Sequence, residues 1–510
     1  MTTINSNRDG AKQSPWQSAG KRATAATPEN KTYDCLIVGG GITGLTAALL
    51  LQKAGRQTVI AEAHTAGFGT TGGTSAHINT FADTPYSKAE STFGADGAQG
   101  FADAINGGLN LIRNNISSYN ISCDYELKPG YLYAENEEEA KQLDDIYQGT
   151  VKAGVAAAYT DEVPTPVPFR KALIFEGQAQ FHPVKYLDGL QKAYLEAGGT
   201  LSENTLVEGI DSENGIHTAH AGEKSIRAKA VIYATHMPPN ITLLNFECVP
   251  YRSYVIAVEL ENGQYPDALI YDSQEPYHYM RSHVIDGKAL LLIGGCDHKT
   301  GHGDPAQAFA SLEEYTRKYY KVSSVRYRWS SQYYAPIDGF PYIGQLPMMA
   351  DGIYCATGYN GNGMMLGSIA GQILADLVSG KGSSYEKLFS PSRIKPIDGF
   401  SEFVKENVDV AYHFIADRWS IKDTDTLKGL PPGTGKVVEV NGKKIAAYRD
   451  DAGAIHALNP VCTHAACIVG WNGEEKSWDC PCHGARYDID GNVLTGPATK
   501  KLTKINNDED

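Results

Sequence analysis

The sequence predicts an α/β domain with an inserted antiparallel sheet, followed by a small all-β domain at its C-terminal end. A strand–turn–helix–strand run, YDCLIVGGGITGLTAALLLQKAGRQTVIAEA, begins near residue 33. From there to about residue 400, helical segments mix irregularly with aromatic-rich strands such as YRSYVIAVEL. Beyond about residue 425 short alternating strands and turns follow, and Asn441-Gly442 is typical of a tight hairpin.

Changes in composition divide the chain into four segments. Residues 1–31 are polar and are predicted to form an N-terminal tail. Residues 32–400 form the larger domain. A helical linker is expected over 401–424, because Ser401 can cap a segment with apolar residues at helical spacing. Residues 425–505 form the small β domain.

Bulk properties exclude several classes of partner. The net charge of −14 argues against nucleic acid and anionic membranes as partners. No apolar run reaches the length of a membrane span, so we expect none. The N-terminal segment contains no apolar core of a secretory signal, and we therefore predict a cytoplasmic protein.

Three glycines in the opening run have the spacing G-x-G-x-x-G. Gly39 permits the turn, Gly41 lets the backbone approach a pyrophosphate, and Gly44 lets helix and strand pack closely. Glu62, at the end of the second strand, is placed to bind a ribose. The pattern indicates a dinucleotide site; a glycine-rich turn without a ligand is the alternative.

Cysteine usage is uneven along the chain. Five cysteines are scattered singly, whereas four lie within the 21 residues from Cys462 to Cys482. Within this cluster, Cys462-x-His464 and Cys480-x-x-His483 each offer one thiolate and one imidazole. Two thiolates and two imidazoles are the ligand set of a Rieske 2Fe–2S centre. A Cys₂His₂ zinc site is the alternative, although its usual spacing differs.

Several further segments carry a family resemblance over about residues 33–395. GFGTTGGTSAHIN, AKAVIYATHMPP, APIDGFPYIG and DGIYCATGYNGNGMMLGSIAGQILADLVSG together resemble the D-amino-acid oxidase superfamily of FAD-dependent amine oxidoreductases. The resemblance implies a Rossmann-like FAD-binding domain with an inserted antiparallel-sheet substrate domain. It assigns the FAD contacts to Gly39, Gly41, Gly44, Glu62, Thr70, Thr71, Thr74, Val207, Gly358, Gly361, Gly363 and Met364.

The small β domain resembles Rieske ferredoxin-like domains over about 425–505. The resemblance implies a 2Fe–2S cluster on the four ligands just named. In the Rieske proteins of cytochrome bc complexes, cysteines at the positions of Cys467 and Cys482 form a disulfide, which we therefore expect here; two free thiols are the alternative. The chain has Tyr487 but also Ala485, where high-potential relatives have serine, so we expect a lower potential.

The substrate-binding residues are the least defined part of the prediction. Arg252 or Arg281 could bind a carboxylate, and Tyr279 could enclose an alkylammonium group. His77 is a further candidate, either as a polar pocket residue or as a flavin contact; a role at the surface is the alternative. These residues could equally pack the sheet.

The two expected cofactors together suggest an oxidoreductase. An amine or amino acid would reduce FAD, and electrons would pass through the 2Fe–2S cluster to an external acceptor. Two alternatives stay open: reverse flow, in which a donor protein feeds a reductase or monooxygenase-like reaction through the cluster, and a non-catalytic redox sensor or electron-transfer module.

Overall fold

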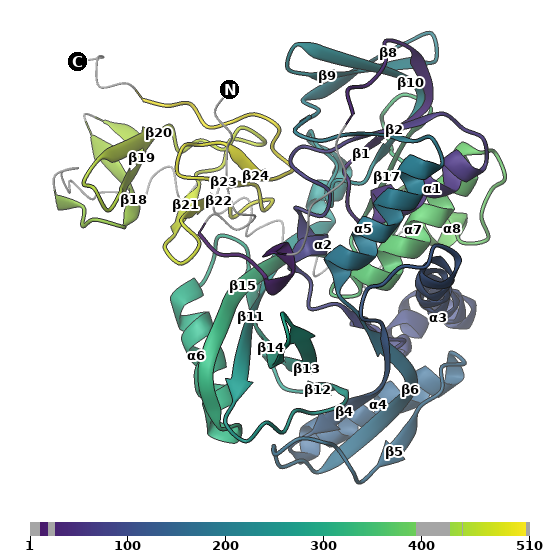
Figure 1. Cartoon of the computed structure of the whole chain (residues 1–510), viewed down its shortest axis with the longest axis vertical. Coiled ribbons are helices and arrows are strands. Elements are labelled where there is room, and N and C mark those ends of the chain that lie inside the picture. The colour runs from purple at the N-terminus through teal and green to yellow at the C-terminus, as the bar shows by residue number, and fades with distance from the viewer. Residues whose placement is uncertain (1–10, 19–25, 394–428, 441, 506–510) are drawn as a thin grey trace.

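The computed structural model describes residues 11–18, 26–393, 429–440 and 442–505. Figure 1 shows an α/β part, an antiparallel sheet below it, and a smaller β domain beside both. The expected linker helix over 401–424 lies outside the described residues. No helix in the described ranges is long and apolar enough to cross a membrane.

The α/β part is built on an eight-stranded sheet with the order β16-β17-β10-β1-β2-β7, and with β8 and β9 continuing from β10. The central strands are parallel and almost wholly buried, as expected for a sheet covered on both faces. Its strands are β1 (Thr32–Val38), β2 (Thr58–Ala61), β7 (Thr200–Ser202), β8 (Gly209–Glu213), β9 (Ile216–Ala221), β10 (Lys224–Tyr233), β16 (Tyr342–Gln345) and β17 (Ile353–Thr357).

The second sheet has nine strands in the order β15-β11-β14-β13-β12-β4-β6-β3, with β5 on β6. Its pairings are antiparallel except for β4 with β12. Its strands are β3 (His77–Ile78), β4 (Glu126–Ala134), β5 (Ala158–Thr160), β6 (Lys171–Gln180), β11 (Cys248–Leu260), β12 (Leu269–Asp272), β13 (His278–Ile285), β14 (Lys288–Lys299) and β15 (Val322–Pro336).

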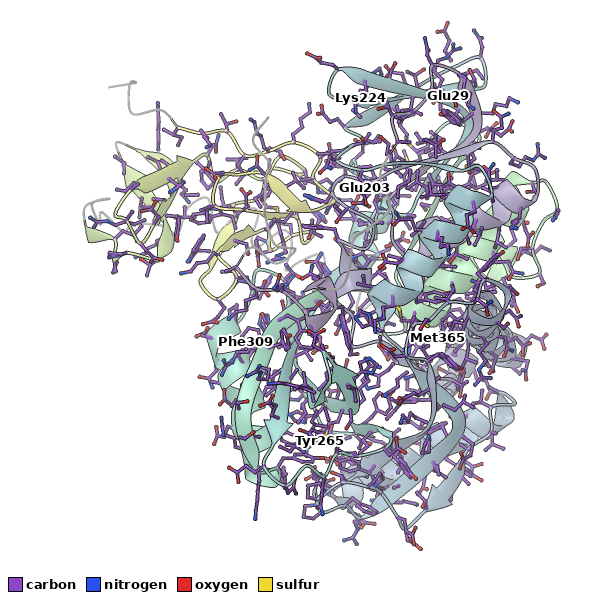
Figure 2. The ribbon with its side chains drawn as sticks, viewed as in Figure 1. Glu29, Glu203, Lys224, Tyr265, Phe309 and Met365 are labelled. Carbon is purple, nitrogen blue, oxygen red and sulfur yellow. A yellow bond between two sulfur atoms is a disulfide. The ribbon has the colours of Figure 1, made fainter. Side chains whose placement is uncertain are left out.

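The helices cover the faces of these sheets. The helix α1 packs against both α5 and α7, and α6 covers the antiparallel sheet through the buried Phe309 (Figure 2). The helical segments are η1 (Pro15–Ser18), α1 (Ile42–Lys53), α2 (Thr70–Gly73), α3 (Tyr86–Ser118), α4 (Glu137–Lys152), α5 (Pro183–Glu196), η2 (Leu243–Phe246), α6 (Pro305–Tyr319), α7 (Gly363–Val378) and α8 (Glu386–Phe389).

The small C-terminal domain contains a three-stranded and a four-stranded antiparallel sheet. The strands are β18 (Gly435–Val440), β19 (Lys443–Arg449), β20 (Ile455–Leu458), β21 (Gly470–Asn472), β22 (Ser477–Asp479), β23 (Arg486–Tyr487) and β24 (Val493–Thr495). The prediction of a separate all-β domain is confirmed.

The N-terminal segment differs from the polar tail that its composition predicts. Trp16 is fully buried, and its indole N–H donates to the Thr74 carbonyl at 2.7 Å. Its ring packs against His182 and His283. Lys12 also pairs with Glu474 of the small domain at 2.7 Å. One large apolar side chain therefore anchors an otherwise polar stretch to the body of the protein.

Candidate functional site

A cavity of about 1500 Å³ passes between the two large sheets. The glycine turn after β1 lines one end, and the second sheet lines the other. Residues 492–501 of the small domain complete the wall near Val207 and Glu208. Thr499 donates to the Glu208 carbonyl at 3.3 Å, so the small domain contacts this end directly.

The glycine turn has the close packing that its spacing predicts. A Cβ atom at Gly39 would lie 2.5 Å from the Ala234 carbonyl oxygen, and one at Gly44 would lie 2.0 Å from the Gly39 carbonyl oxygen. Gly41 lies at the N-terminus of α1 and lines the cavity. Backbone N–H groups at a helix N-terminus favour an anion, so the turn suits a pyrophosphate.

Glu62 follows β2, and backbone N–H groups hold both oxygens of its carboxylate. The Gly40 N–H donates to one carboxylate oxygen at 2.7 Å, and the His64 N–H donates to the other at 2.9 Å. The carboxylate lines the cavity. This position suits the ribose hydroxyls of an adenine dinucleotide.

The other predicted FAD contacts fall into two groups. Gly44 and Gly358 are not part of the cavity wall; Gly44 packs against the turn, and Gly358, at φ +75°, approaches Cys248 and Pro336. The following predicted residues do line the cavity: Gly39, Gly41, Glu62, Thr70, Thr71, Thr74, Val207, Gly361, Gly363 and Met364.

His77 and Tyr279 both line the end of the cavity that belongs to the second sheet. Their rings lie 5.5 Å apart, edge to face. Burial, together with the nearby Arg281 charge, lowers the pKa of His77 to about 3, so its imidazole is neutral. Arg281 itself does not line the cavity; it is fully buried, donates to the Ala76 and Phe181 carbonyls, and lies over the Trp16 ring.

Arg252 lies at the junction with the small domain, outside the cavity wall. Its guanidinium contacts the Glu475 carboxylate at 2.8 and 3.0 Å, and both side chains are buried. Arg486 joins the same carboxylate at 2.5 Å. Burial opposes ionisation of Glu475, but Arg252 and Arg486 hold its pKa below the ordinary value. A carboxylate-binding role for Arg252 is therefore not supported, because its charge is already paired.

Two loops of the small domain bring the four predicted metal ligands together. The Cys462 and Cys480 thiols are both buried, and the proximity of Cys480 lowers the pKa of Cys462 below its ordinary value. The His464 and His483 rings lie 5.0 Å apart. Among the described residues, neither Nδ1 atom has a hydrogen-bond partner although both are buried. Two thiols and two unpaired imidazole nitrogens fit a Rieske cluster.

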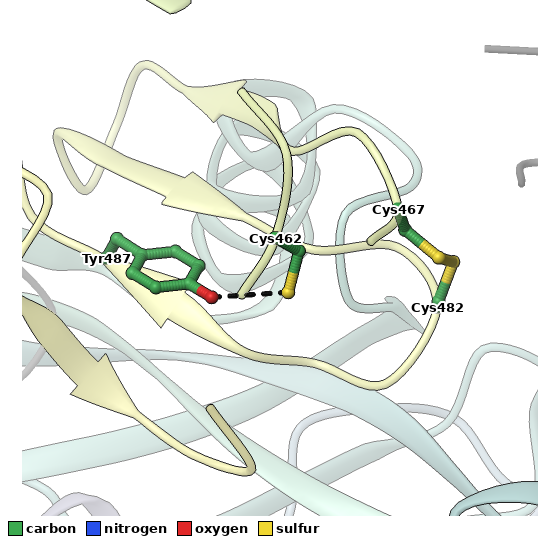
Figure 3. Close-up of a disulfide and its surroundings, with 4 residues drawn as sticks. All are labelled: Cys462, Cys467, Cys482 and Tyr487. Carbon is green, nitrogen blue, oxygen red and sulfur yellow. Dashed lines mark hydrogen bonds between the residues drawn. A yellow bond between two sulfur atoms is a disulfide. The ribbon is translucent and has the colours of Figure 1, made fainter. Parts of the chain in front are cut away.

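A disulfide joins Cys467 to Cys482, one residue on each loop, with their Cα atoms 6.5 Å apart (Figure 3). The predicted bridge is confirmed. The Tyr487 hydroxyl lies 3.2 Å from the Cys462 sulfur. Ala485 is fully buried nearby, and its carbonyl accepts from the Cys480 N–H.

The junction between the cavity and the metal loops contains side chains that sequence reasoning did not single out. His236 lines the cavity, and its ring centroid lies 4.6 Å from that of Tyr334. The buried Tyr334 hydroxyl donates to the carbonyl of His483 at 2.9 Å. Gln332 donates to the Gly484 carbonyl at 3.1 Å. The two hydrogen bonds join residues about 150 positions apart, and no local sequence pattern predicts them.

Comparison with known proteins agrees with this arrangement. Residues 34–377 match the FAD dependent oxidoreductase family, and residues 421–506 match the Rieske [2Fe-2S] domain. The chain belongs to the FAD-dependent oxidoreductases and carries a C-terminal Rieske domain. It therefore binds FAD and a 2Fe–2S cluster.

The chain is similar over its whole length to YhfW of Bacillus subtilis (strain 168), which is named as a Rieske 2Fe-2S iron–sulfur protein. The two are 32% identical over 98% of this chain and 100% of YhfW. Gamma-glutamylputrescine oxidoreductase of Escherichia coli (strain K12) is 26% identical over 70% of this chain and 86% of its own. Glycine oxidase from Geobacillus kaustophilus shares the fold, with a TM-score of 0.60 and 21% identity, over 71% of this chain and 99% of that one.

Proposed function

We propose that this oxidoreductase is a dehydrogenase that passes electrons from its amine or amino-acid substrate through the 2Fe–2S cluster to an external acceptor. Oxidation of a carbon–nitrogen single bond to an imine releases two electrons and two protons. FAD accepts electrons in pairs, whereas a Rieske cluster carries one at a time. One chain that holds both cofactors can convert a two-electron oxidation into single-electron transfers.

The contact between the cavity wall and a cluster ligand carries this proposal. His236 meets Tyr334 ring to ring, and Tyr334 is hydrogen-bonded to the backbone of His483. Thr70, a predicted FAD contact, lies 3.2 Å from His236 through its hydroxyl. Packed side chains therefore connect the wall of the FAD cavity to the cluster loop, and this contact supports electron exchange within one molecule.

The remaining roles follow from position. The turn at Gly39–Gly44 and Glu62 would hold the ADP half of FAD, and the N-terminus of α7 would lie near the flavin. Cys462, His464, Cys480 and His483 would ligate the cluster. A cytoplasmic location and an external electron partner stay predictions.

The test is anaerobic addition of candidate amines to the purified holoprotein, followed by EPR and visible absorbance. We expect the flavin to bleach and a Rieske signal to appear with a substrate amine. Tyr334→Leu should slow the appearance of the EPR signal at least tenfold while leaving flavin bleaching unchanged, because it removes the packed contact with His483.

Two outcomes would overturn the proposal. A flavin that bleaches while the cluster stays oxidised would mean that electrons do not flow from FAD to the cluster. Cluster reduction by an external donor, followed by flavin reduction, would favour the reverse reaction instead.

A further inference from the structure

The substrate end of the cavity has an unusual lining. Five tyrosines contribute to its wall, and we call this part the tyrosine chamber: Tyr251, Tyr271, Tyr277, Tyr279 and Tyr333. The rings of Tyr251 and Tyr333 are stacked with centroids 5.7 Å apart, and those of Tyr277 and Tyr279 lie 5.9 Å apart. His77 connects Tyr279 to Tyr271.

Carboxylates accompany these rings. Asp83 lines the chamber and is open to the cavity, and one of its oxygens accepts from the Gly361 N–H at 2.6 Å. Asp297 lies behind the wall, where one oxygen accepts from the hydroxyls of Tyr333 at 3.0 Å and Tyr277 at 3.3 Å. Its other oxygen is buried, and Ser253 adds a further hydrogen-bond interaction with this carboxylate.

Neither carboxylate forms an ion pair with a lysine or an arginine in the part of the chain that the structure describes. Burial, with a contribution from the Asp83 charge, raises the pKa of Asp297 to about 6, and desolvation also raises the pKa of Asp83. Among the described residues that line the whole cavity, lysines occur only at positions 500 and 501, in the small domain, and no arginine is present. Arg252 and Arg281 are the two arginines that could have bound a substrate carboxylate. Arg252 is paired with Glu475 instead, and Arg281 donates to the Phe181 carbonyl.

We propose that the tyrosine chamber, with Asp83 and Asp297, binds a cationic aliphatic amine that bears no carboxylate, such as a diamine, in preference to an α-amino acid. This inference rests on the proposed amine oxidation and names its substrate class. Aromatic faces attract an ammonium group, and Asp83 supplies the opposite charge. Asp297 is a positioning residue, because it orients the Tyr277 and Tyr333 hydroxyls. An α-carboxylate in this chamber would instead face the Asp83 carboxylate, and no arginine or lysine of the described wall at this end of the cavity would offset that repulsion.

The binding test uses the FAD- and cluster-loaded protein and a ligand that cannot be oxidised to an imine at its charged nitrogen, 1,4-bis(trimethylammonio)butane. Its affinity is followed by the perturbation of the flavin absorbance and by calorimetry. We expect Asp83→Asn to weaken binding at least tenfold, and Asp297→Asn to weaken it less. Asp161→Asn, on an exposed loop, is the matched control and should change nothing.

Asp83→Asn keeps a carbonyl oxygen for the Gly361 N–H, so the local backbone contact survives. If a variant fails to retain FAD, Tyr277→Phe provides a milder second test, because it removes one hydroxyl that donates to Asp297, and it should weaken binding of the probe. Equal affinity for the probe in Asp83→Asn, Asp161→Asn and the unchanged protein would overturn the inference.

Reduction kinetics separate this inference from the proposed function. With 1,4-diaminobutane and with glycine as substrates, we expect flavin reduction by the diamine at lower concentration. If glycine is the better reductant and the Rieske signal still appears, the inference fails and the proposed electron route stands. If the diamine binds and bleaches the flavin but the cluster stays silent, the electron route fails and the inference stands.

Discussion

The hydroxyl of Tyr487 provides a direct test of how this chain sets the potential of its cluster. The hydroxyl lies 3.2 Å from the Cys462 sulfur. The Thr463 N–H also donates to this hydroxyl at 3.2 Å, and the Thr463 hydroxyl donates to the Lys500 carbonyl at 2.6 Å. The Tyr487 oxygen is therefore held in place as an acceptor, and its own proton can be shared between the Cys462 sulfur at 3.2 Å and the Thr463 hydroxyl oxygen at 3.1 Å.

A hydrogen bond to a cluster sulfur stabilises the reduced state more, because that state carries one more negative charge. A bond to a charged group contributes about 1.5–3 kcal/mol. If about 1.4 kcal/mol of this is specific to the reduced state, the equilibrium shifts tenfold. For a one-electron couple this corresponds to about 59 mV. Tyr487→Phe should therefore lower the midpoint potential by about 60 mV.

The measurement is a redox titration of the holoprotein followed by EPR. Tyr448→Phe is the matched control, because Tyr448 is buried in the same domain and stacks on Trp471 at 4.8 Å. Ala485→Ser should change the potential in the opposite direction, upward, because it restores the hydroxyl that high-potential relatives carry. An unchanged potential in Tyr487→Phe, or a shift equal to that of Tyr448→Phe, would refute the reasoning.

Three further predictions concern stability and cofactor retention. Arg252→Met leaves the buried Glu475 carboxylate with Arg486 as its remaining arginine contact and should destabilise the docked protein by about 1–3 kcal/mol, measured by chemical unfolding. Glu62→Gln should weaken FAD binding about tenfold, because a charged acceptor for the ribose is lost, and released flavin fluorescence measures this. Burial depresses the pKa of His283 to about 2, against about 6.5 when unfolded. The unfolded chain then binds more protons below pH 6.5, so stability should fall as the pH decreases from about 6.5, by up to about 1.4 kcal/mol per pH unit for this group. His283→Gln should flatten that slope in unfolding curves at pH 7.5 and 5.5, and an unchanged slope would contradict the assignment.

Local patterns account for the parts of the molecule that could be predicted from the sequence. The Gly39–Gly44 turn and the ligand pairs at Cys462 and Cys480 each depend on residues a few positions apart, whose spacing is fixed by backbone geometry. The same holds for the division into an α/β part and a β domain, which follows from the period of the apolar residues.

Contacts between distant residues could not be predicted in this way. Arg252 resembles a substrate-binding residue in sequence because nothing near it supplies a counter-charge; its partner Glu475 lies 223 positions away. Tyr334 sits in an aromatic-rich strand where alternate tyrosines commonly pack the sheet, and its bond to His483 depends on domain docking. Trp16 is the one aromatic residue in the polar stretch 1–31, and its burial depends on contacts with residues far away in the sequence.

The small domain's contribution to the cavity wall has a kinetic consequence. Because residues 492–501 cover the end where Glu62 and Val207 lie, the dinucleotide cannot leave by that side unless the small domain tilts away. Escape of the flavin would then be gated by undocking, so its dissociation rate would report the lifetime of the closed arrangement. Insertion of the flavin would in turn precede final closure, which gives the assembly of the two redox centres a preferred order.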